Sequence, residues 1–216
     1  MPSTTYIVQP GDCLSSIAAE NGFKDWTALY NHPDNADLKS KRKDPNILAP
    51  GDKVIIPEKE PHSESRATGA RYTFKVDSED VTLRIVLLDS DDKPLKSKKY
   101  TLSVNGKDFN GSTDGSGLLK QSIPPLAKSA TLKLFLDGGP DDPGVDFPLD
   151  LGDLDPVETD SGFIQRLQNL GYNFKPDDSD SLSNAITAFQ KKYNLDQNGN
   201  ADSPTREKLR SFHDGT

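Results

Sequence analysis

Alternating and helically spaced apolar residues predict a small α+β region at the start of the chain. Tyr6 and Val8 alternate with polar residues as in an edge strand, and a Pro-Gly corner follows. Helical spacing of apolar residues then appears in residues 14–23 ("LSSIAAENGF") and 24–33 ("KDWTALYNHP"). Residues 52–57 ("DKVIIP") are predicted to form a closing strand. The predicted order is therefore strand, helix, helix, strand.

The middle of the chain has a different pattern. Short segments alternate apolar and polar residues, and Asp, Asn, Gly and Pro between them supply turns. The segments are 72–76 ("YTFKV"), 81–89 ("VTLRIVLLD"), 100–106 ("YTLSVNG"), 117–123 ("GLLKQSI") and 130–136 ("ATLKLFL"). Short strands at this close spacing predict a small antiparallel β-sandwich, with a barrel as the alternative.

Beyond residue 160 the apolar spacing is that of amphipathic helices. The first stripe consists of Phe163, Ile164, Leu167 and Leu170, and Gly171 follows it as a C-terminal cap. The second stripe consists of Leu182, Ala185, Ile186, Phe189 and Tyr193. Ser203 and Pro204 open a last helix, "PTREKLRSFH". These patterns predict a C-terminal three-helix bundle.

Two polar segments separate these parts. "EKEPHSESRATGA" has the composition of a linker, and a stretch rich in Asp, Gly and Pro follows the predicted strands. We interpret that second stretch as a connection that packs on its neighbours. The predicted organisation is multidomain, with an α+β domain at 1–58, a linker at 59–70, a β-sandwich spacer at 71–137, a connecting segment at 138–159 and a three-helix domain at 160–216.

Composition and charge exclude several classes of protein. The 216 residues are 32% hydrophobic and 28% charged, which favours several small domains over one large core. The formal net charge is −8 and no segment forms a basic footprint, so nucleic acid is excluded as a partner. No apolar run approaches the roughly 20 residues of a spanning helix, which predicts no membrane insertion. The one cysteine, Cys13, cannot form an internal disulfide.

The N-terminal region resembles a LysM domain over residues 5–57. The matching pieces are "YIVQPGDCLSSIA", "LYNHP" and "NILAPGDKVIIP", in that order. LysM domains bind N-acetylglucosamine-containing polymers, chiefly peptidoglycan and chitin, in a shallow groove between two loops. Exposed backbone groups of such a groove pair with the acetamido group, and an apolar floor receives its methyl group. The resemblance implies a glycan-binding site at Gly11, Asp12, Cys13, Leu14, Pro45, Asn46, Ile47 and Leu48.

This copy departs from the LysM pattern in two places. Cys13 stands where the family usually has Thr or Ser, and residues 34–45 lengthen the segment before the second loop. Cys13 is interpreted as a small half-buried side chain at a helix start, with a reactive thiol as the alternative. Asp12 is expected to cap the following helix through backbone N–H groups, with a ligand contact as the alternative.

The C-terminal region is similar to the peptidoglycan-binding type 1 domain, a three-helix module often attached to wall hydrolases. "FIQRLQNLGY", "AITAFQKKYNL" and "ADSPTREKL" carry this resemblance, which covers about residues 160–214. Leu167, Leu170 and Phe189 are expected in the core. Residues 196–202 ("DQNGNAD") lack the final Glu of a calcium loop and are expected to be a turn. The middle unit is loosely similar to carboxypeptidase-regulatory-like spacers around "STDGSG" and is expected to be structural.

No catalytic constellation is found in the sequence. The three histidines, His32, His62 and His213, are expected in a helix-end turn, in the linker and in a frayed tail, and no two have metal-ligand spacing. The carboxylates cluster in turns with Gly and Pro, where solvation explains them. We therefore expect no enzyme activity, no metal and no cofactor.

Two functions remain open from the sequence. The first is a non-catalytic cell-wall binding protein, in which two weak modules gain avidity by linkage. The alternative is an adaptor or structural component that docks onto the spike or effector of a type VI secretion or phage-tail-like system, or a helper that presents a partner hydrolase. The opening residues "MPSTT" lack the pattern of a signal peptide, so cytoplasmic synthesis is expected, with delivery to the periplasm or cell envelope by a secretion machine.

Overall fold

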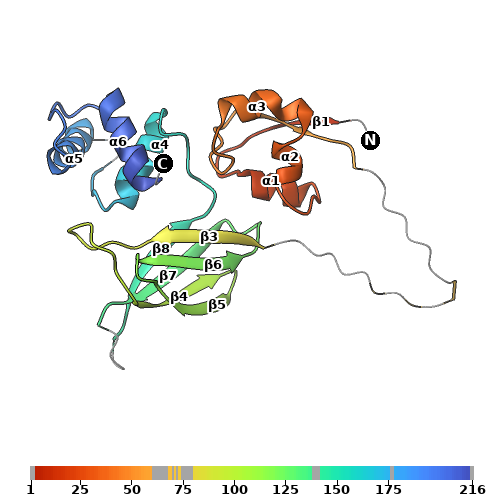
Figure 1. Ribbon diagram of the computed structural model, residues 1–216, viewed down its shortest axis with the longest axis horizontal. Coiled ribbons are helices and arrows are strands. Elements are labelled where there is room, and N and C mark those ends of the chain that lie inside the picture. Colours follow the sequence, from red (N-terminus) through yellow and green to blue (C-terminus); the bar gives the residue numbers. More distant parts are fainter. Residues whose placement is uncertain are drawn as a thin grey trace. The chain divides into compact units, whose positions relative to one another are not determined.

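The computed structural model describes residues 3–59, 68–69, 71, 73, 80–137, 142–175 and 178–214. The chain divides into two compact units, one of Met1–Asn46 with Pro50–Asp153 and one of Ile47–Ala49 with Leu154–Thr216. An N-terminal region of strands and helices, central antiparallel sheets and C-terminal helices follow one another along the chain (Figure 1), which confirms the expected classes of structure. Most of the predicted linker and the strand predicted at 72–76 lie outside the described residues.

In the N-terminal region a two-stranded antiparallel sheet joins the two ends of a helical segment. Strand β1 (Thr4–Ile7) pairs with β2 (Lys53–Ile56), with Tyr6 opposite Val54. The elements between the strands are α1 (Leu14–Glu20), α2 (Thr27–Tyr30), the 3₁₀ helix η1 (Pro33–Asn35) and α3 (Ala36–Lys41). The predicted helical stripe of α1 is buried, since Leu14, Ile17 and Ala18 are at most 1% exposed.

Residues 34–45, which lengthen the segment before the second loop, contain the end of η1 and the whole of α3. Pro33 starts η1, where its missing N–H is tolerated, and Leu38 of α3 is buried. Asn35 is also buried, and its side-chain amide forms two hydrogen bonds with the backbone of Ile55. Nδ2 donates to Ile55 O at 2.7 Å, and Oδ1 accepts from Ile55 N at 2.7 Å. Asn35 thus acts like an additional backbone partner for β2.

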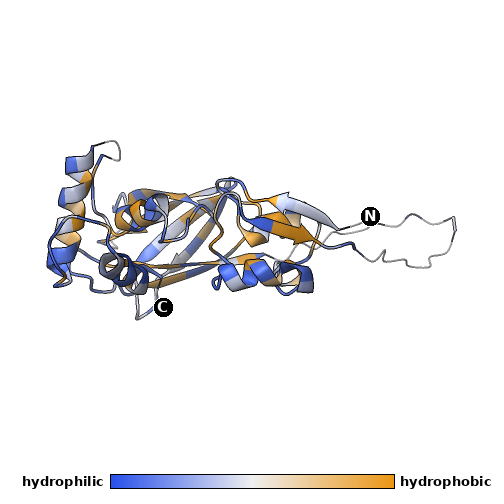
Figure 2. Cartoon of the chain, turned by 90° about the horizontal axis from the view of Figure 1, so that it is seen from above, coloured by the Kyte–Doolittle hydropathy of each residue, from blue (hydrophilic) through white to orange (hydrophobic). Residues whose placement is uncertain are grey.

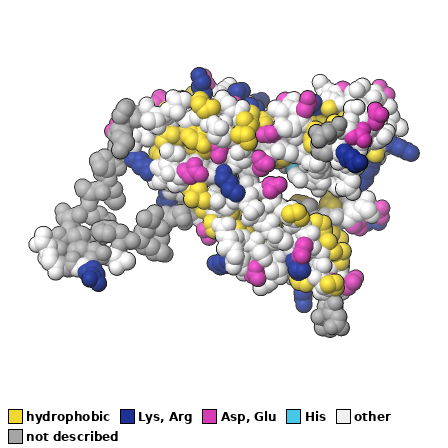
Figure 3. Space-filling model, turned by 180° about the vertical axis from the view of Figure 1, so that it is seen from behind, with side chains coloured by type: hydrophobic (Ala, Val, Ile, Leu, Met, Phe, Trp, Pro, Cys, Tyr) yellow, Lys and Arg dark blue, Asp and Glu magenta, His cyan; other side chains and the backbone are white. Residues whose placement is uncertain are grey.

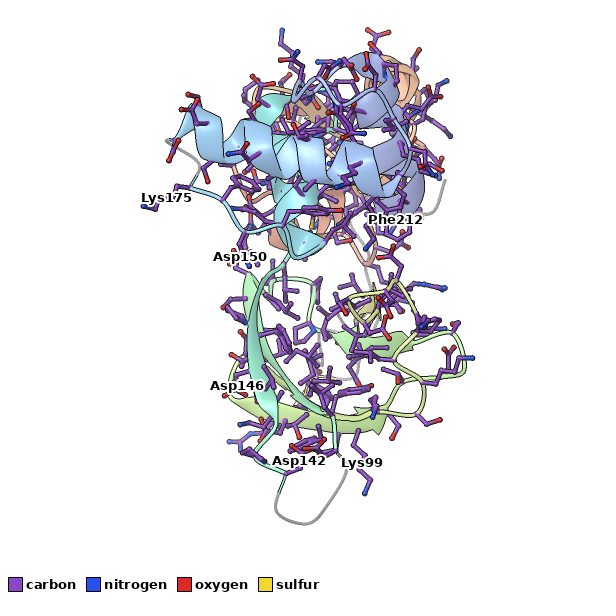
Figure 4. The ribbon with its side chains drawn as sticks, turned by 90° about the vertical axis from the view of Figure 1, so that its left-hand side faces the viewer. Lys99, Asp142, Asp146, Asp150, Lys175 and Phe212 are labelled. Atoms are coloured by element: carbon purple, nitrogen blue, oxygen red, sulfur yellow. The ribbon has the colours of Figure 1, made fainter. Side chains whose placement is uncertain are left out.

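Two antiparallel sheets make up the middle of the chain. One pairs β3 (Val81–Val86) with β6 (Leu118–Ile123). The other has the order β5-β4-β7-β8 and consists of β5 (Lys107–Ser112), β4 (Lys99–Val104), β7 (Ser129–Phe135) and β8 (Val145–Asp150). Residues of both sheets, among them Leu119, Leu102 and Leu132, belong to one apolar core, and Figure 4 shows side chains filling the space between the strands.

Two of these strands differ from the expectation. Residues 107–116, between two of the predicted segments, are expected to supply a turn, but only Asn105 and Gly106 form the hairpin turn, both with positive φ (49° and 76°), and Lys107–Ser112 form β5. Strand β8 lies in the segment interpreted as a connection. Its alternation of apolar residues with Asp is a strand signal that the neighbouring Gly and Pro residues obscured.

Pro148 fits β8 because β8 is the last strand in the order of its sheet. Leu151 N donates to Lys128 O, so in this register the residues at 149, 147 and 145 also bond toward β7, whereas those at 150, 148 and 146 direct their backbone groups away from it. The N–H that proline lacks is therefore on the outer side of β8, where β7 does not need it.

Where the C-terminal unit is described, it contains three helices, as predicted. They are α4 (Asp160–Asn169), α5 (Ser179–Lys192) and α6 (Ser203–His213), each with a side-chain cap from Thr159, Asp178 or Asp202. The core consists of Phe163, Leu167, Ile186, Phe189 and Leu209. The expected core residues Leu167 and Phe189 are fully buried, and Leu170 packs against them.

The surface agrees with a mixed-charge protein. Figure 2 shows hydrophobic positions interrupted by hydrophilic ones along the helices, and Figure 3 shows acidic and basic side chains interspersed over the visible face. Within the described ranges, no helix combines the length and apolar character that crossing a bilayer requires.

Candidate functional site

The first predicted loop, Gly11–Leu14, is a corner that is tied back onto β1. Gly11 has φ 77°, a left-handed conformation that glycine adopts without strain. Asp12 Oδ2 accepts hydrogen bonds from the Tyr6 hydroxyl at 2.7 Å and from Gln9 N at 2.8 Å. The expectation that Asp12 caps α1 is wrong, because the carboxylate bonds to residues that precede it.

Tyr6 is held as a hydrogen-bond donor in this corner. Its hydrogen bond to Asp12, together with burial and the charge of that carboxylate, raises the pKa of Tyr6 to about 12. The phenol therefore remains protonated at any physiological pH. Asp12 and Tyr6 form a fixed pair that sets the direction of the chain between β1 and α1.

The start of α1 is organised by Ser16 and Cys13. Ser16 Oγ accepts from Cys13 N at 3.1 Å and donates to Cys13 O at 2.9 Å, while the Cys13 sulfur lies 3.6 Å from the same oxygen. The Cys13 side chain is half-buried, in agreement with the interpretation as a small packed side chain. Leu14 is 1% exposed, so its side chain belongs to the interior and is not available to a ligand.

The second predicted loop is held by a local turn. Asp44 Oδ1 accepts from both the backbone N and the side-chain Nδ2 of Asn46, each at 2.9 Å. Asn46 is exposed, whereas Leu48 is 3% exposed. Pro45 and Asn46 belong to the first compact unit, but Ile47 and Leu48 are grouped with the second. A groove that uses both predicted loops therefore stays a prediction.

The helical unit contains a buried ion pair that the sequence motifs did not predict. Arg166 is 0% exposed, and its Nε and Nη2 donate to the carboxylate of Asp214 at 3.0 Å. Its Nη1 donates to the carbonyl oxygens of Asp155 and Gly162, each at 2.8 Å. The guanidinium is thus paired on every side, which a fully buried charge requires.

Asp214 also bonds to His213, which was expected in a frayed tail. His213 is instead the last residue of α6, with Nδ1 2.7 Å from Asp214 Oδ1 and Nε2 3.1 Å from Asn169 Nδ2. Burial acts to raise the pKa of Asp214, but hydrogen bonds from His213 and Arg166 and their charges outweigh it and hold that pKa below its usual range. The network joins the end of α6 to α4.

A second buried polar group holds the 196–202 turn. The Nε2 atom of Gln190 lies 2.9 Å from Asn198 Oδ1 and 3.1 Å from the carbonyl oxygen of Asn200, and its Oε1 accepts from Gly199 N at 2.9 Å. Asp202 in turn accepts from Asn198 Nδ2 at 2.8 Å. The side chains of Asn198 and Asp202 are used in internal hydrogen bonds, which fits the expected turn.

The exposed side of α6 is the candidate binding surface of the helical unit. An open, shallow depression there is lined by Pro204, Glu207, Lys208, Arg210 and Ser211. Lys208 Nζ lies 5.3 Å from the ring centre of half-buried Tyr193, whose ring centre lies 5.0 Å from that of Phe212 with the two ring planes tilted by 52°. Lysine and arginine beside aromatic rings can pair with carboxylates and pack against sugar rings.

The structure brings no further candidate chemistry together among the residues it describes. Within those ranges, no group of three or more His, Cys, Asp or Glu side chains is placed to hold a metal ion. His32 accepts a hydrogen bond from Asp34 N at the start of η1, and His62 lies outside the described residues.

The comparisons with known proteins bear on the helical unit. Residues 164–209 match a family model described as "Putative peptidoglycan binding domain". The matched segment runs from α4 into α6 and includes Arg166, Gln190 and the 196–202 turn. No curated protein and no solved structure matches the chain. The C-terminal resemblance is confirmed at this level, because residues 164–209 are similar to a peptidoglycan-binding domain, and the LysM resemblance stays a prediction.

Proposed function

We propose that this protein is a non-catalytic binding protein of the bacterial cell wall. Its helical unit holds peptidoglycan, and its N-terminal region holds N-acetylglucosamine-containing glycan. The observation that carries the proposal is the match of residues 164–209 to the peptidoglycan-binding family model. The core and caps of α4, α5 and α6 support it, because they form the three-helix module that the match implies.

The exposed side of α6 is the surface that we assign to wall binding. Peptidoglycan presents sugar rings together with the carboxylates of its peptide stems. Lys208 and Arg210 offer positive charge to those carboxylates, and Tyr193 and Phe212 offer aromatic surface to the sugars. The side chain of Arg210 is 44% exposed and its ion pair with Glu158 is long at 3.6 Å, so it can be redirected to a ligand.

The N-terminal region adds a second, weak contact. Its pairing of β1 with β2 around α1 and α2 agrees with the order of elements in a LysM domain, which supports a glycan role for the corner at Gly11–Cys13. Two weak contacts in one chain raise the apparent affinity for a polymer that carries many copies of the ligand. The proposal implies association with the cell envelope.

The proposal is tested by sedimentation of the full chain with insoluble peptidoglycan sacculi. The double variant Lys208→Ala, Arg210→Ala should reduce the affinity about five- to tenfold, since each exposed charge contact contributes up to about 1 kcal/mol. Lys93→Ala, Lys96→Ala is the matched control, because it removes the same charge from an exposed loop of the other unit. Equal retention of both variants would exclude the α6 surface, and a wild-type chain left in the supernatant would exclude wall binding.

One observation favours the alternative function, an adaptor that docks onto the spike or effector of a contractile injection system. Val145 and Phe147 of β8 are 44% and 42% exposed although they lie opposite buried Leu134 and Leu132 of β7. Neighbouring exposed apolar side chains are a feature of protein-binding surfaces. In this case Phe147→Ser should abolish co-elution with a purified spike protein, and it should leave retention on sacculi unchanged.

A further inference from the structure

The N-terminal corner is already in contact with another part of its own compact unit. The Lys128 ammonium donates to the Gly11 carbonyl oxygen at 2.7 Å and lies 3.5 Å from Asp12 Oδ1. Lys128 directly precedes β7, and its neighbour Ala127 is buried. The ammonium thus reaches the corner from a well-packed part of the β sheet.

A second segment of the sheet region reaches the same corner. A β-carbon placed on Gly152 would lie 3.2 Å from the sulfur of Cys13, and one placed on Gly11 would lie 3.6 Å from Asp153 Oδ1. The two segments are joined to each other, since Leu151 N donates to Lys128 O at 2.9 Å. Two joined segments of the sheet region therefore lie against the corner.

We infer that Lys128 closes the N-terminal glycan site, so that sugar binding by the corner requires release of this contact. The inference rests on the proposed glycan role of Gly11–Cys13 and adds its regulation. A sugar hydroxyl or acetamido N–H that bonds to the Gly11 carbonyl competes with the Lys128 ammonium for the same oxygen. Asp12 is held from the other side by Tyr6 and Gln9, so it cannot turn away to leave the ammonium unpaired.

The closed state, in which Lys128 contacts the corner, is only slightly more stable than the open state, so the contact opens readily and acts as a gate. The side chain of Lys128 is 51% exposed, and ion pairs at such positions contribute little and are screened by salt. The apparent affinity of the corner for glycan equals its intrinsic affinity multiplied by the fraction of open molecules. For an uncharged sugar, added salt should thus strengthen binding, which is the opposite of ordinary electrostatic attraction.

The contact itself is tested by carbodiimide coupling, which joins an amine and a carboxylate that touch. The wild-type chain should give an isopeptide between Lys128 and Asp12, detected by peptide mass. Lys133→Ala is the matched control, because Lys133 is another half-exposed lysine of the same sheet that pairs with Asp146. The Lys133→Ala control should give the same Lys128–Asp12 product. If the wild type does not give this product, the inference is overturned.

The gate is tested by titrating the full chain with the uncharged tetramer of N-acetylglucosamine. Lys128→Ala should bind about two- to fivefold more tightly than the wild type and Lys133→Ala should not, given the small contribution of exposed ion pairs. Raising the salt concentration should increase the affinity of the wild type for the tetramer and leave the affinity of Lys128→Ala unchanged. Equal affinities for the wild type and Lys128→Ala would overturn the gate. Coupling without any sugar binding would overturn the N-terminal glycan site and its gate, while wall binding by α6 is judged separately on sacculi.

Discussion

The helical unit and the N-terminal region both depend on polar side chains with little exposure, but they use them differently. In the helical unit Arg166 and Gln190 are 0% exposed and hold α4, α6 and the 196–202 turn in place. In the N-terminal region Asp12 holds a corner that is itself the predicted binding surface. The family match in the first case covers the interior of a module, whereas the resemblance in the second covers a predicted binding surface.

This difference explains why the two resemblances carry unequal weight for function. The match over residues 164–209 includes four of the five buried residues of the helical core, so it points to the module without naming the atoms that touch the wall. The exposed side of α6 had to be found from the structure. The corner at Gly11–Cys13 could be named from the sequence, but its contacts with Lys128 could not.

The largest effect that would separate the two regions is expected from Arg166→Ala. Removal of the guanidinium leaves the buried carboxylate of Asp214 without its main partner, which should lower the free energy of unfolding of the helical unit by about 3–5 kcal/mol. Urea unfolding followed by far-ultraviolet circular dichroism measures this. The fluorescence of Trp26, the chain's one tryptophan, reports on the N-terminal region and should show an unchanged transition.

The pH dependence sharpens the same prediction. Because the pKa of Asp214 is lower in the folded state than in the unfolded state, the stability it provides is present above its unfolded pKa and is lost as the pH falls through its folded pKa. Acid should therefore destabilise the wild-type helical unit, and Asp214→Asn should reduce this dependence on pH.

The control for Arg166→Ala is Arg210→Ala, which removes an exposed arginine from the same unit and should change the unfolding midpoint little. A loss of stability in Arg210→Ala as large as that in Arg166→Ala would contradict the stabilising role of the buried Arg166–Asp214 pair.

A smaller effect is expected from Gln190→Ala. The change leaves Gly199 N and the polar groups of the 196–202 turn without their buried partner, at a cost of about 2–3 kcal/mol in the helical unit. Amide hydrogen exchange of Gly199 measures the loss directly and should accelerate. Gln168→Ala, an exposed glutamine on α4, is the matched control and should leave that exchange rate unchanged.

The smallest effect is expected in the N-terminal region, from Tyr6→Phe. The variant keeps the ring and removes one partly buried hydrogen bond to Asp12, which should lower the free energy of unfolding by about 0.5–1.5 kcal/mol. Trp26 fluorescence in urea measures it, while the circular dichroism transition of the helical unit serves as the internal control. An effect larger than that of Gln190→Ala would reverse the comparison between the two regions.

Local patterns predicted the elements better than they predicted the polar contacts. The stripes of α4 and α5 placed Phe163, Leu167 and Phe189 in the core, because apolar spacing and burial follow from the same helix geometry. The same patterns treat Arg166 as a solvent-facing residue. Its partner is Asp214, 48 positions later, and a pairing at that distance leaves no mark in a local window.

The misplaced features of the other unit have equally local causes. An aspartate before a helix ordinarily caps it, and only the position of Tyr6 on β1 shows that Asp12 bonds backward. Strand β8 alternates correctly, but Pro148 and the surrounding Asp and Gly residues suggested a connection. The candidate loops at 11–14 and 45–48 were named from resemblance alone, and their common groove is still a prediction.

Pro148 has a consequence for how the protein behaves at high concentration. An outermost strand with an uninterrupted row of outward N–H groups is a template on which further chains can stack, and aggregates grow from such templates. In β8 the middle position of that row has no hydrogen to donate. The chain can thus carry the apolar side chains of Val145 and Phe147 on an outer strand while the backbone beside them resists the growth of fibrils.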